Sequence, residues 1–229
     1  MQALIPGPGP TNETVHVMNR AHFVGGYRVI GALLIIAALV YNIAVKWDEP
    51  AFQLTNFFSF FTVLSNLFAA VVLLLAARVP VESQIVEVLR GATVVYMVTT
   101  GLVYAALLAD ANVQAVPFSN WVLHRIMPLV IALDWLLVPP RTRLALRRTS
   151  LWLLFPLVYV TYTLVRGLFT DWYPYPFLNP DKPGGYGQVA VMSLMITMLF
   201  VALTLVTTWS ARRTTVGPVD NDRLDAEAI

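Results

Sequence analysis

The sequence lacks cysteine and is poor in charge. With no cysteine among its 229 residues, a disulfide scaffold, a thiol nucleophile and a thiolate metal site are all excluded. Charged residues make up only 12%, about half of what soluble domains carry. Hydrophobic residues reach 58% and the mean hydropathy is +0.68, which is typical of an integral membrane protein.

Six apolar runs are long enough to cross a bilayer as helices. They cover residues 27–45, 54–77, 86–108, 121–138, 151–169 and 188–209, of which the fourth is the shortest. We therefore predict an all-α fold, a polytopic bundle of six transmembrane helices. No second domain fits into connections this short, so we divide the chain into a loose N-terminal arm (1–26), the transmembrane domain (27–209) and a tail (210–229).

The basic residues sort by side of the membrane. Eleven of the 15 fall on one side: Arg20, Arg28, Arg78, Arg90, Arg141, Arg143, Arg147, Arg148, Arg212, Arg213 and Arg223. The positive-inside rule then places both termini in the cytoplasm and the connections 46–53, 109–120 and 170–187 outside. The isoelectric point near 9.0 comes with a net charge of only +2, so we expect membrane lipids and not nucleic acid as partners.

A polar stripe marks the second apolar run. On a continuous helix, Thr55, Ser59, Thr62 and Asn66 would share one face, with Ser65 beside them. Small hydroxylated side chains often do no more than bond one membrane helix to another. The stripe therefore predicts either a helix contact or a chemical site inside the membrane.

Ionisable side chains inside the predicted spans are costly and therefore informative. These side chains are His124, Arg125, Asp134 and Arg166. Asp134 lies near the cytoplasmic end of its span, where we expect a structural ion pair with Arg141 or Arg143. Arg166 lies near an outer end, where it either extends to the interface or meets an anionic headgroup.

His124 and Thr62 approach the same depth from the outer face. From the outer ends of their runs, Thr62 lies ~12 Å deep and His124 ~5 Å deep at the rise of an α-helix. Side-chain reach, helix tilt or an earlier start of the fourth helix near Phe118 would close this mismatch of about one turn. A threonine hydroxyl becomes a nucleophile when an adjacent imidazole takes its proton, whereas a lone histidine is more often structural.

The connection after the fifth run is rich in proline and aromatic residues. Residues 171–180 hold three prolines together with Trp172 and Tyr175, side chains that favour the headgroup level. We interpret this connection as a stiff segment on the membrane surface, serving either as an interface anchor or as a lid over the side where His124 lies.

Three sequence islands together resemble a known family. They are Phe61-Thr62-Val63-Leu64-Ser65-Asn66, the stretch Asn120-Trp121-Val122-Leu123-His124-Arg125-Ile126-Met127-Pro128 running to Asp134-Trp135, and Trp172-Tyr173-Pro174-Tyr175-Pro176-Phe177-Leu178. Across all six runs, the chain resembles the prokaryotic six-helix membrane branch of the androgen-induced-gene family. Its animal members are multipass threonine hydrolases that cleave fatty acid esters of hydroxy fatty acids.

The resemblance implies roles for individual residues. It makes Thr62 the nucleophile and His124 the general base of a lipid ester hydrolase that needs no cofactor or metal, located in a bacterial plasma membrane. Ser65 and Asn66 would donate to an oxyanion, hold water or bridge helices, and Arg166, Trp172 and Tyr175 would bind substrate or support the site. The alternative is a non-enzymatic bundle, such as a small transporter or a lipid-binding protein, although paired breaks in matching spans, which favour a transporter, are not evident.

Overall fold

The protein is a bundle of membrane-spanning helices. A computed structural model describes residues 12–78, 83–109 and 116–214, and these residues form helices and turns without a strand. Six stretches are long and apolar enough to cross a membrane: Asn19–Lys46, Phe61–Arg78, Gln84–Leu108, Pro117–Leu137, Leu146–Thr170 and Gly185–Arg213. The predicted all-α, six-span architecture is confirmed.

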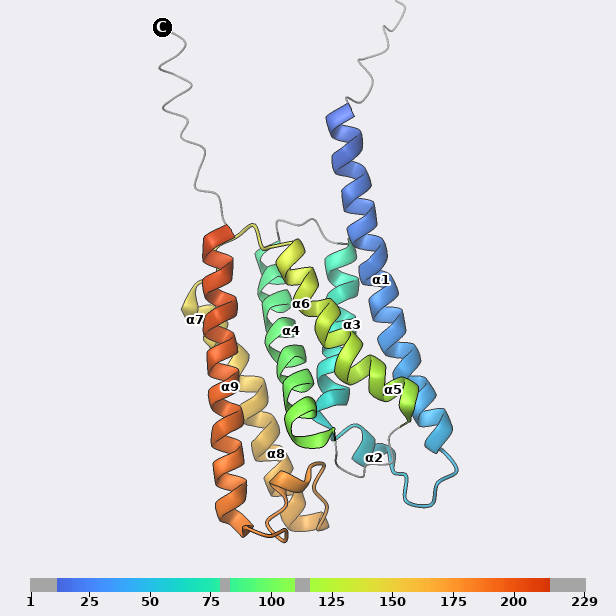
Figure 1. Ribbon diagram of the computed structural model, residues 1–229, viewed down its shortest axis with the longest axis vertical. Coiled ribbons are helices and arrows are strands. Elements are labelled where there is room, and N and C mark those ends of the chain that lie inside the picture. The colour runs from blue at the N-terminus through green and yellow to red at the C-terminus, as the bar shows by residue number, and fades with distance from the viewer. Residues whose placement is uncertain (1–11, 79–82, 110–115, 215–229) are drawn as a thin grey trace, which may run out of the picture.

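Several spans are built from more than one helical element (Figure 1). The single-helix spans are α1 (Asn12–Lys46), α3 (Phe61–Arg78) and α9 (Gly185–Thr214), with the short α2 (Leu54–Phe57) before α3. The third span joins α4 (Gln84–Val103) to the π-helical η1 (Tyr104–Leu108), and the fourth joins α5 (Pro117–Trp121), the π-helical η2 (Val122–Ile126) and α6 (Met127–Leu137). The fifth joins α7 (Leu146–Thr149), the 3₁₀ turn η3 (Ser150–Leu153) and α8 (Leu154–Thr170), and the 3₁₀ turn η4 (Pro176–Leu178) precedes α9.

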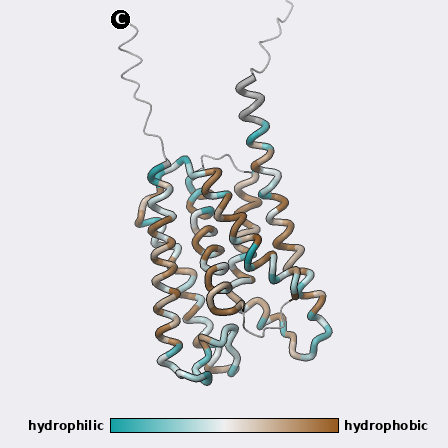
Figure 2. Tube along the Cα trace, in the orientation of Figure 1, coloured by the Kyte–Doolittle hydropathy of each residue, from teal (hydrophilic) through white to brown (hydrophobic). Residues whose placement is uncertain are grey.

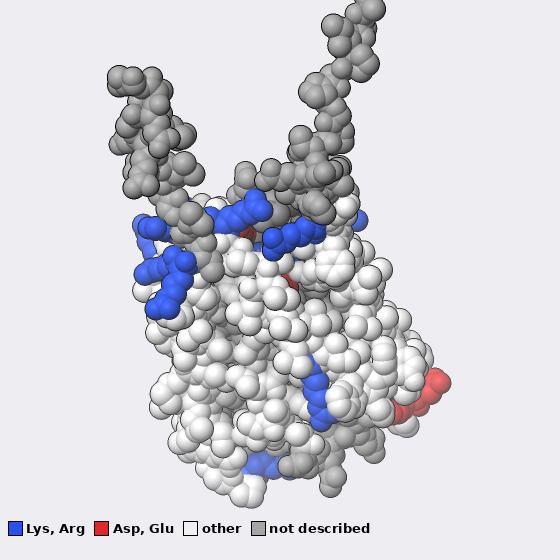
Figure 3. Space-filling model, turned by 45° about the horizontal axis from the view of Figure 1, so that its top comes forward, with Lys and Arg blue, Asp and Glu red and all other residues white. Residues whose placement is uncertain are grey.

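The bundle has one arginine-rich end. The beginning of α1 and the end of α9 lie at the same end, as an even number of spans requires (Figure 1). Lys and Arg side chains gather there, while the flanks of the bundle are largely uncharged and apolar (Figures 2 and 3). By the positive-inside rule this is the cytoplasmic end, and we refer to the opposite end as the outer end.

Helix α4 forms the centre of the bundle. It packs against α3 on one side, α6 on another and α9 on a third, while α1 covers the far side of α3. Small residues permit this approach: a Cβ at Gly91 would fall 2.4 Å from the Trp152 ring, so only glycine fits there. By contrast, α9 packs against α4, η3 and η4 and makes little contact along α8 itself.

The predicted arm is helical over much of its length. Helix α1 begins at Asn12, so the expectation that residues 1–26 form a loose arm is wrong from Asn12 onward. Residues 1–11, the end of the predicted tail and its acidic stretch at 220–227 lie outside the described residues.

The second span does not begin where its apolar run begins. The expected helix over 54–77 is broken at residues 58–60, and α3 starts only at Phe61. Ser59 accounts for part of the break, because its hydroxyl donates to the Thr55 carbonyl at 2.6 Å and its own carbonyl accepts from the Tyr159 hydroxyl at 2.9 Å. The four-residue polar stripe is therefore not a single helical face.

Asp134 pairs with different arginines from those expected. Its carboxylate accepts from Arg28 Nε at 2.8 Å and from an Arg90 Nη at 2.7 Å, and the Tyr27 hydroxyl also donates to it. The predicted pairing with Arg141 or Arg143 is wrong, because the connection at 138–145 is held by Glu87, whose carboxylate accepts from the backbone N–H of Arg141. The ion pairs thus join α1, α4 and α6 in the cytoplasmic half.

Candidate functional site

Thr62 lies at the beginning of α3, near the outer end of the bundle. The first backbone N–H groups of a helix have no partner within it. Here two tyrosine hydroxyls supply partners, since Phe61 N–H donates to the Tyr159 hydroxyl at 3.1 Å and Thr62 N–H to the Tyr175 hydroxyl at 3.4 Å. The break before Phe61 therefore places Thr62 at a buried helix start whose free N–H groups find partners in the fifth span and the following connection.

The structure brings Thr62 and His124 together. The Thr62 Oγ1 and His124 Nε2 atoms are 3.2 Å apart, and Thr62 is only 7% exposed. The difference in depth that the sequence predicted for Thr62 and His124 disappears because both helices start at other residues than expected. Helix α3 starts at Phe61, close to Thr62, and the fourth span starts at Pro117, before the expected Trp121.

A backbone carbonyl fixes the tautomer of His124. Its Nδ1 lies 3.2 Å from the Asn120 carbonyl oxygen, which can only accept a hydrogen bond. Nδ1 must therefore carry the proton, so Nε2 presents its lone pair to the Thr62 hydroxyl. The Tyr104 ring stacks on the imidazole at 4.3 Å between ring centroids. The Tyr104 hydroxyl in turn accepts a hydrogen bond from the Asn120 side-chain amide at 2.7 Å.

His124 lies on the π-helical turn η2, and Pro128 explains part of this local geometry. Proline has no N–H, so the His124 carbonyl has no helical donor four residues later, which favours a widened turn. Gly101 lets α4 approach this point closely, because a Cβ there would lie 3.0 Å from Pro128 Cβ and 3.4 Å from the His124 carbonyl oxygen. Widened turns of this kind are common at functional sites.

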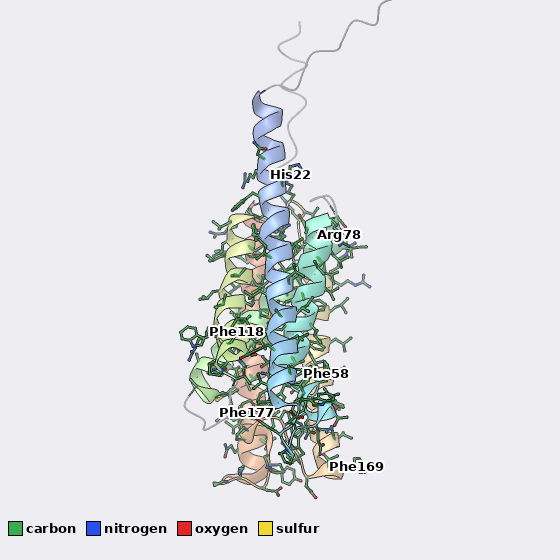
Figure 4. All side chains as sticks on the ribbon, turned by 90° about the vertical axis from the view of Figure 1, so that its right-hand side faces the viewer. His22, Phe58, Arg78, Phe118, Phe169 and Phe177 are labelled. Carbon is green, nitrogen blue, oxygen red and sulfur yellow. The ribbon has the colours of Figure 1, made fainter. Side chains whose placement is uncertain are left out.

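The connection between α8 and α9 closes the outer side of the site. Tyr175 is buried, stacks on Phe177 at 5.1 Å and places its hydroxyl 3.5 Å from Thr62 Oγ1. Burial raises the pKa of the Tyr175 hydroxyl above its usual 10.0, so this group remains a hydrogen-bond donor at neutral pH. Figure 4 shows Phe177 in the half of the bundle away from His22 and Arg78, together with Phe58 and Phe118.

Ser65 and Asn66 surround the Thr62 backbone and not its hydroxyl. Asn66 Nδ2 donates to the Thr62 carbonyl at 2.8 Å and to the Leu123 carbonyl at 3.2 Å. Ser65 Oγ lies 3.2 Å from the Thr62 carbonyl oxygen and 3.1 Å from Thr100 Oγ1. Both residues are fully buried, and these partners correspond to the helix-bridging role that the sequence left open.

Arg166 and Trp172 form a second layer around the site. The Arg166 guanidinium lies 4.7 Å from the centroid of the Trp172 ring and donates to the Asn56 side chain at 2.7 Å. Trp172 in turn contacts Phe60, which contacts Tyr175, each pair at 5.7 Å between ring centroids. These two residues therefore reach Thr62 only through aromatic neighbours.

A cavity of about 200 Å³ adjoins Thr62, and His124 is not among the residues that line it. Its walls are largely apolar and come from α4, α8 and α9, with Tyr175, Phe177 and Leu178 at its outer end. The cavity therefore has the kind of lining that ligand sites have, mostly apolar with a few polar groups.

Sequence reasoning missed three residues that shape this site. Tyr104, Asn120 and Tyr159 position His124 or the start of α3, as described above. Tyr104 and Tyr159 each belong to a polar stripe, on the third and on the fifth span, and Asn120 precedes His124 by about one helical turn, so all three carried a recognisable signal. The partner of Tyr159 could not be read from the sequence, because that partner is a helix start that the apolar pattern does not reveal.

Comparison of the chain with protein-family models, curated protein sequences and solved structures finds no match. The family resemblance of the three sequence islands therefore stays a prediction. Within the described residues, no three His, Asp or Glu side chains lie close enough together to hold a metal ion.

Proposed function

We propose that the protein is an intramembrane hydrolase of lipid esters, of the type that joins a fatty acid to a hydroxy fatty acid. One observation carries the proposal: the Thr62 hydroxyl lies 3.2 Å from a histidine nitrogen whose lone pair faces it. A hydroxyl beside an oriented neutral imidazole is the arrangement that activates an alcohol as a nucleophile. The apolar cavity beside Thr62 suits the acyl chain of such an ester.

The reaction would proceed in two halves. Thr62 Oγ1 bonds to the ester carbonyl carbon while His124 Nε2 takes the hydroxyl proton. The tetrahedral intermediate collapses, the ester C–O bond breaks, and His124 returns the proton to the departing alkoxide. Water then attacks the acyl-threonine, gives one proton to His124, and releases the free acid as Thr62 recovers its hydroxyl proton.

The Tyr175 hydroxyl is the best-placed group for the developing oxyanion. It is buried, stays protonated at neutral pH and lies beside Thr62 Oγ1. Preorganised donors aimed at the developing charge supply much of the rate enhancement of acyl-transfer enzymes. Ser65 and Asn66 already donate to backbone carbonyls, so in this proposal Tyr175 takes the oxyanion role that the sequence analysis gave as one alternative for them.

Replacing Tyr175 with phenylalanine tests this role. We expect kcat for a long-chain ester to fall about 10²-fold, with KM changed less than threefold, because one oxyanion donor is lost and the ring stays in place. Tyr173→Phe is the matched control, since Tyr173 belongs to the same connection but packs against Gly167. Equal kcat values for the two variants would remove Tyr175 from the mechanism.

Covalent labelling tests the function itself. The purified protein, in detergent or liposomes, is treated with an alkyl fluorophosphonate and the adduct is mapped by mass spectrometry. We expect one adduct on Thr62, absent from Thr62→Ala and formed at least tenfold more slowly in His124→Gln. A protein that binds lipid but forms no adduct would instead be the non-enzymatic bundle.

A further inference from the structure

The cavity beside Thr62 reaches the lipid-facing surface between α8 and α9. Two of its lining residues, Leu157 on α8 and Thr197 on α9, are themselves exposed, Leu157 to 62%. The two helices leave this gap because α9 packs against α4 and against the turns before and after α8, with little contact along α8. The opening therefore faces the hydrocarbon region of the membrane and not the water.

The other ends of the cavity are closed. Toward the cytoplasm, Phe61 and Phe200 line it and pack against each other at 5.7 Å, and both also pack against Tyr96. Toward the outside, the stacked rings of Tyr175 and Phe177 cover it. A molecule approaching from either aqueous side meets packed aromatic rings, so the gap between α8 and α9 is the open side.

The length of the cavity matches one leaflet. The wall formed by α4 and η1 runs from Thr99 to Leu108, about 14 Å at the rise of an α-helix, which is about half of a hydrocarbon core roughly 30 Å thick. This wall ends near the outer surface, so the cavity spans the outer leaflet. An acyl chain of that leaflet can lie along it beside Thr62.

The lining also provides for a polar group. The hydroxyls of Thr99 and Ser193 line the cavity, are buried and have no hydrogen-bond partner within the described residues. A buried hydroxyl without a partner is destabilising. An occupant that carries an oxygen function within an otherwise apolar chain, as a lipid ester does, supplies that partner.

We infer that the substrate is a lipid ester dissolved in the outer leaflet, and that its acyl chain enters sideways between α8 and α9. This inference rests on the proposed hydrolase function. It assigns α8 and α9 as a substrate portal, and it selects esters that partition into lipid over esters that stay in water. Both products, the fatty acid and the hydroxy fatty acid, keep a long chain and would leave through the same gap into the leaflet.

Closing the portal with a bulky side chain tests the inference. In liposomes, Thr197→Trp is compared with Met198→Trp, because Met198 is its neighbour, is 54% exposed and does not line the cavity. We expect Thr197→Trp to lower turnover of a long-chain ester at least tenfold and Met198→Trp to stay within twofold of wild type. Equal long-chain turnover in the two variants would overturn the portal.

Two further measurements separate the portal from the chemistry. A short-chain fluorophosphonate is small enough to pass a narrowed gap, so its rate of Thr62 labelling in Thr197→Trp should fall less than threefold while long-chain turnover falls at least tenfold, which shows that the fold and the Thr62–His124 pair are intact. A diazirine-bearing fatty acid, which needs no turnover, should crosslink to Ile196 and Val160 in wild type and lose this labelling in Thr197→Trp. Labelling confined to the outward-facing Val158 and Met198 would contradict the portal even in a protein that hydrolyses esters, whereas cavity labelling without any hydrolysis would contradict only the hydrolase.

Discussion

Thr62→Ala is expected to lower the turnover of a long-chain ester by at least about 10³-fold, and His124→Ala by a similar factor. Each substitution removes one half of a pair whose atoms are 3.2 Å apart, and the remaining half cannot form the acyl intermediate alone. The residual rate would come from binding and oxyanion stabilisation, which survive the loss of the nucleophile. Turnover is measured in liposomes with wild type at equal protein concentration.

When two residues act as one catalytic unit, the effects of replacing them on the turnover rate are not additive. The double variant of Thr62 and His124 should therefore be no slower than either single variant, within about threefold. Thr62→Ser keeps a hydroxyl and should retain activity that alanine abolishes. Thr55→Ala is the control for a general effect on the outer end, because Thr55 is exposed on α2 and should stay within twofold of wild type. Wild-type turnover in both single alanine variants would end the hydrolase proposal.

The spans could be predicted because membrane insertion leaves a strong mark on composition. Twenty apolar residues in a row have few alternatives to a membrane helix, and all six predicted runs correspond to helical spans. The start of the second helix could not be predicted in the same way. Its apolar run extends back to Leu54, but tyrosines distant in sequence, among them Tyr159, supply hydrogen bonds that let the helix begin anew at Phe61.

The candidate site could be predicted in part for a related reason. The charge pattern placed Thr62 and His124 on one side of the membrane, and geometry left them one turn apart, so their meeting at 3.2 Å required only small changes in helix starts. The roles of the surrounding residues could not be predicted, because each role depends on the atoms that the side chain contacts in the folded bundle. Asn66 belongs to the same stripe as Thr62, but its amide donates to the Leu123 carbonyl. This partner lies on the fourth span, so the sequence of the second span alone cannot predict it.

Asp134 shows the opposite limit. The sequence predicted that Asp134 lies within a span, but it did not predict the partners of the carboxylate. Arg141 and Arg143 were favoured because they lie close to Asp134 along the chain. The actual partners, Arg28 and Arg90, come from the first and third spans. Both guanidiniums are almost fully buried, at 2% and 5% exposure. An arginine counted toward the cytoplasmic charge can therefore also serve as an internal connection between helices.

Removing that carboxylate should have the largest effect on stability. Asp134→Ala leaves two buried guanidiniums without their counter-charge, and breaking a buried pair in this way costs about 3–5 kcal/mol. We expect the free energy of unfolding, measured by titration with a denaturing detergent in mixed micelles, to fall by that amount. Asp48→Ala, an exposed carboxylate in an outer connection, should change it by less than about 0.5 kcal/mol.

A variant that removes all three charges tests whether Asp134→Ala destabilises the protein because two buried positive charges lose their counter-charge. Replacing Arg28 and Arg90 with methionine and Asp134 with leucine removes the whole network, and such apolar replacements often restore stability. We therefore expect this triple variant to be more stable than Asp134→Ala, and the reverse order would mean that hydrogen bonds, and not charge, dominate the network. Because the network lies in the cytoplasmic half and Thr62 in the outer half, the folded fraction of Asp134→Ala should still form the Thr62 adduct at the wild-type rate. Stability and chemistry in this bundle would then be set by different ends of the same helices.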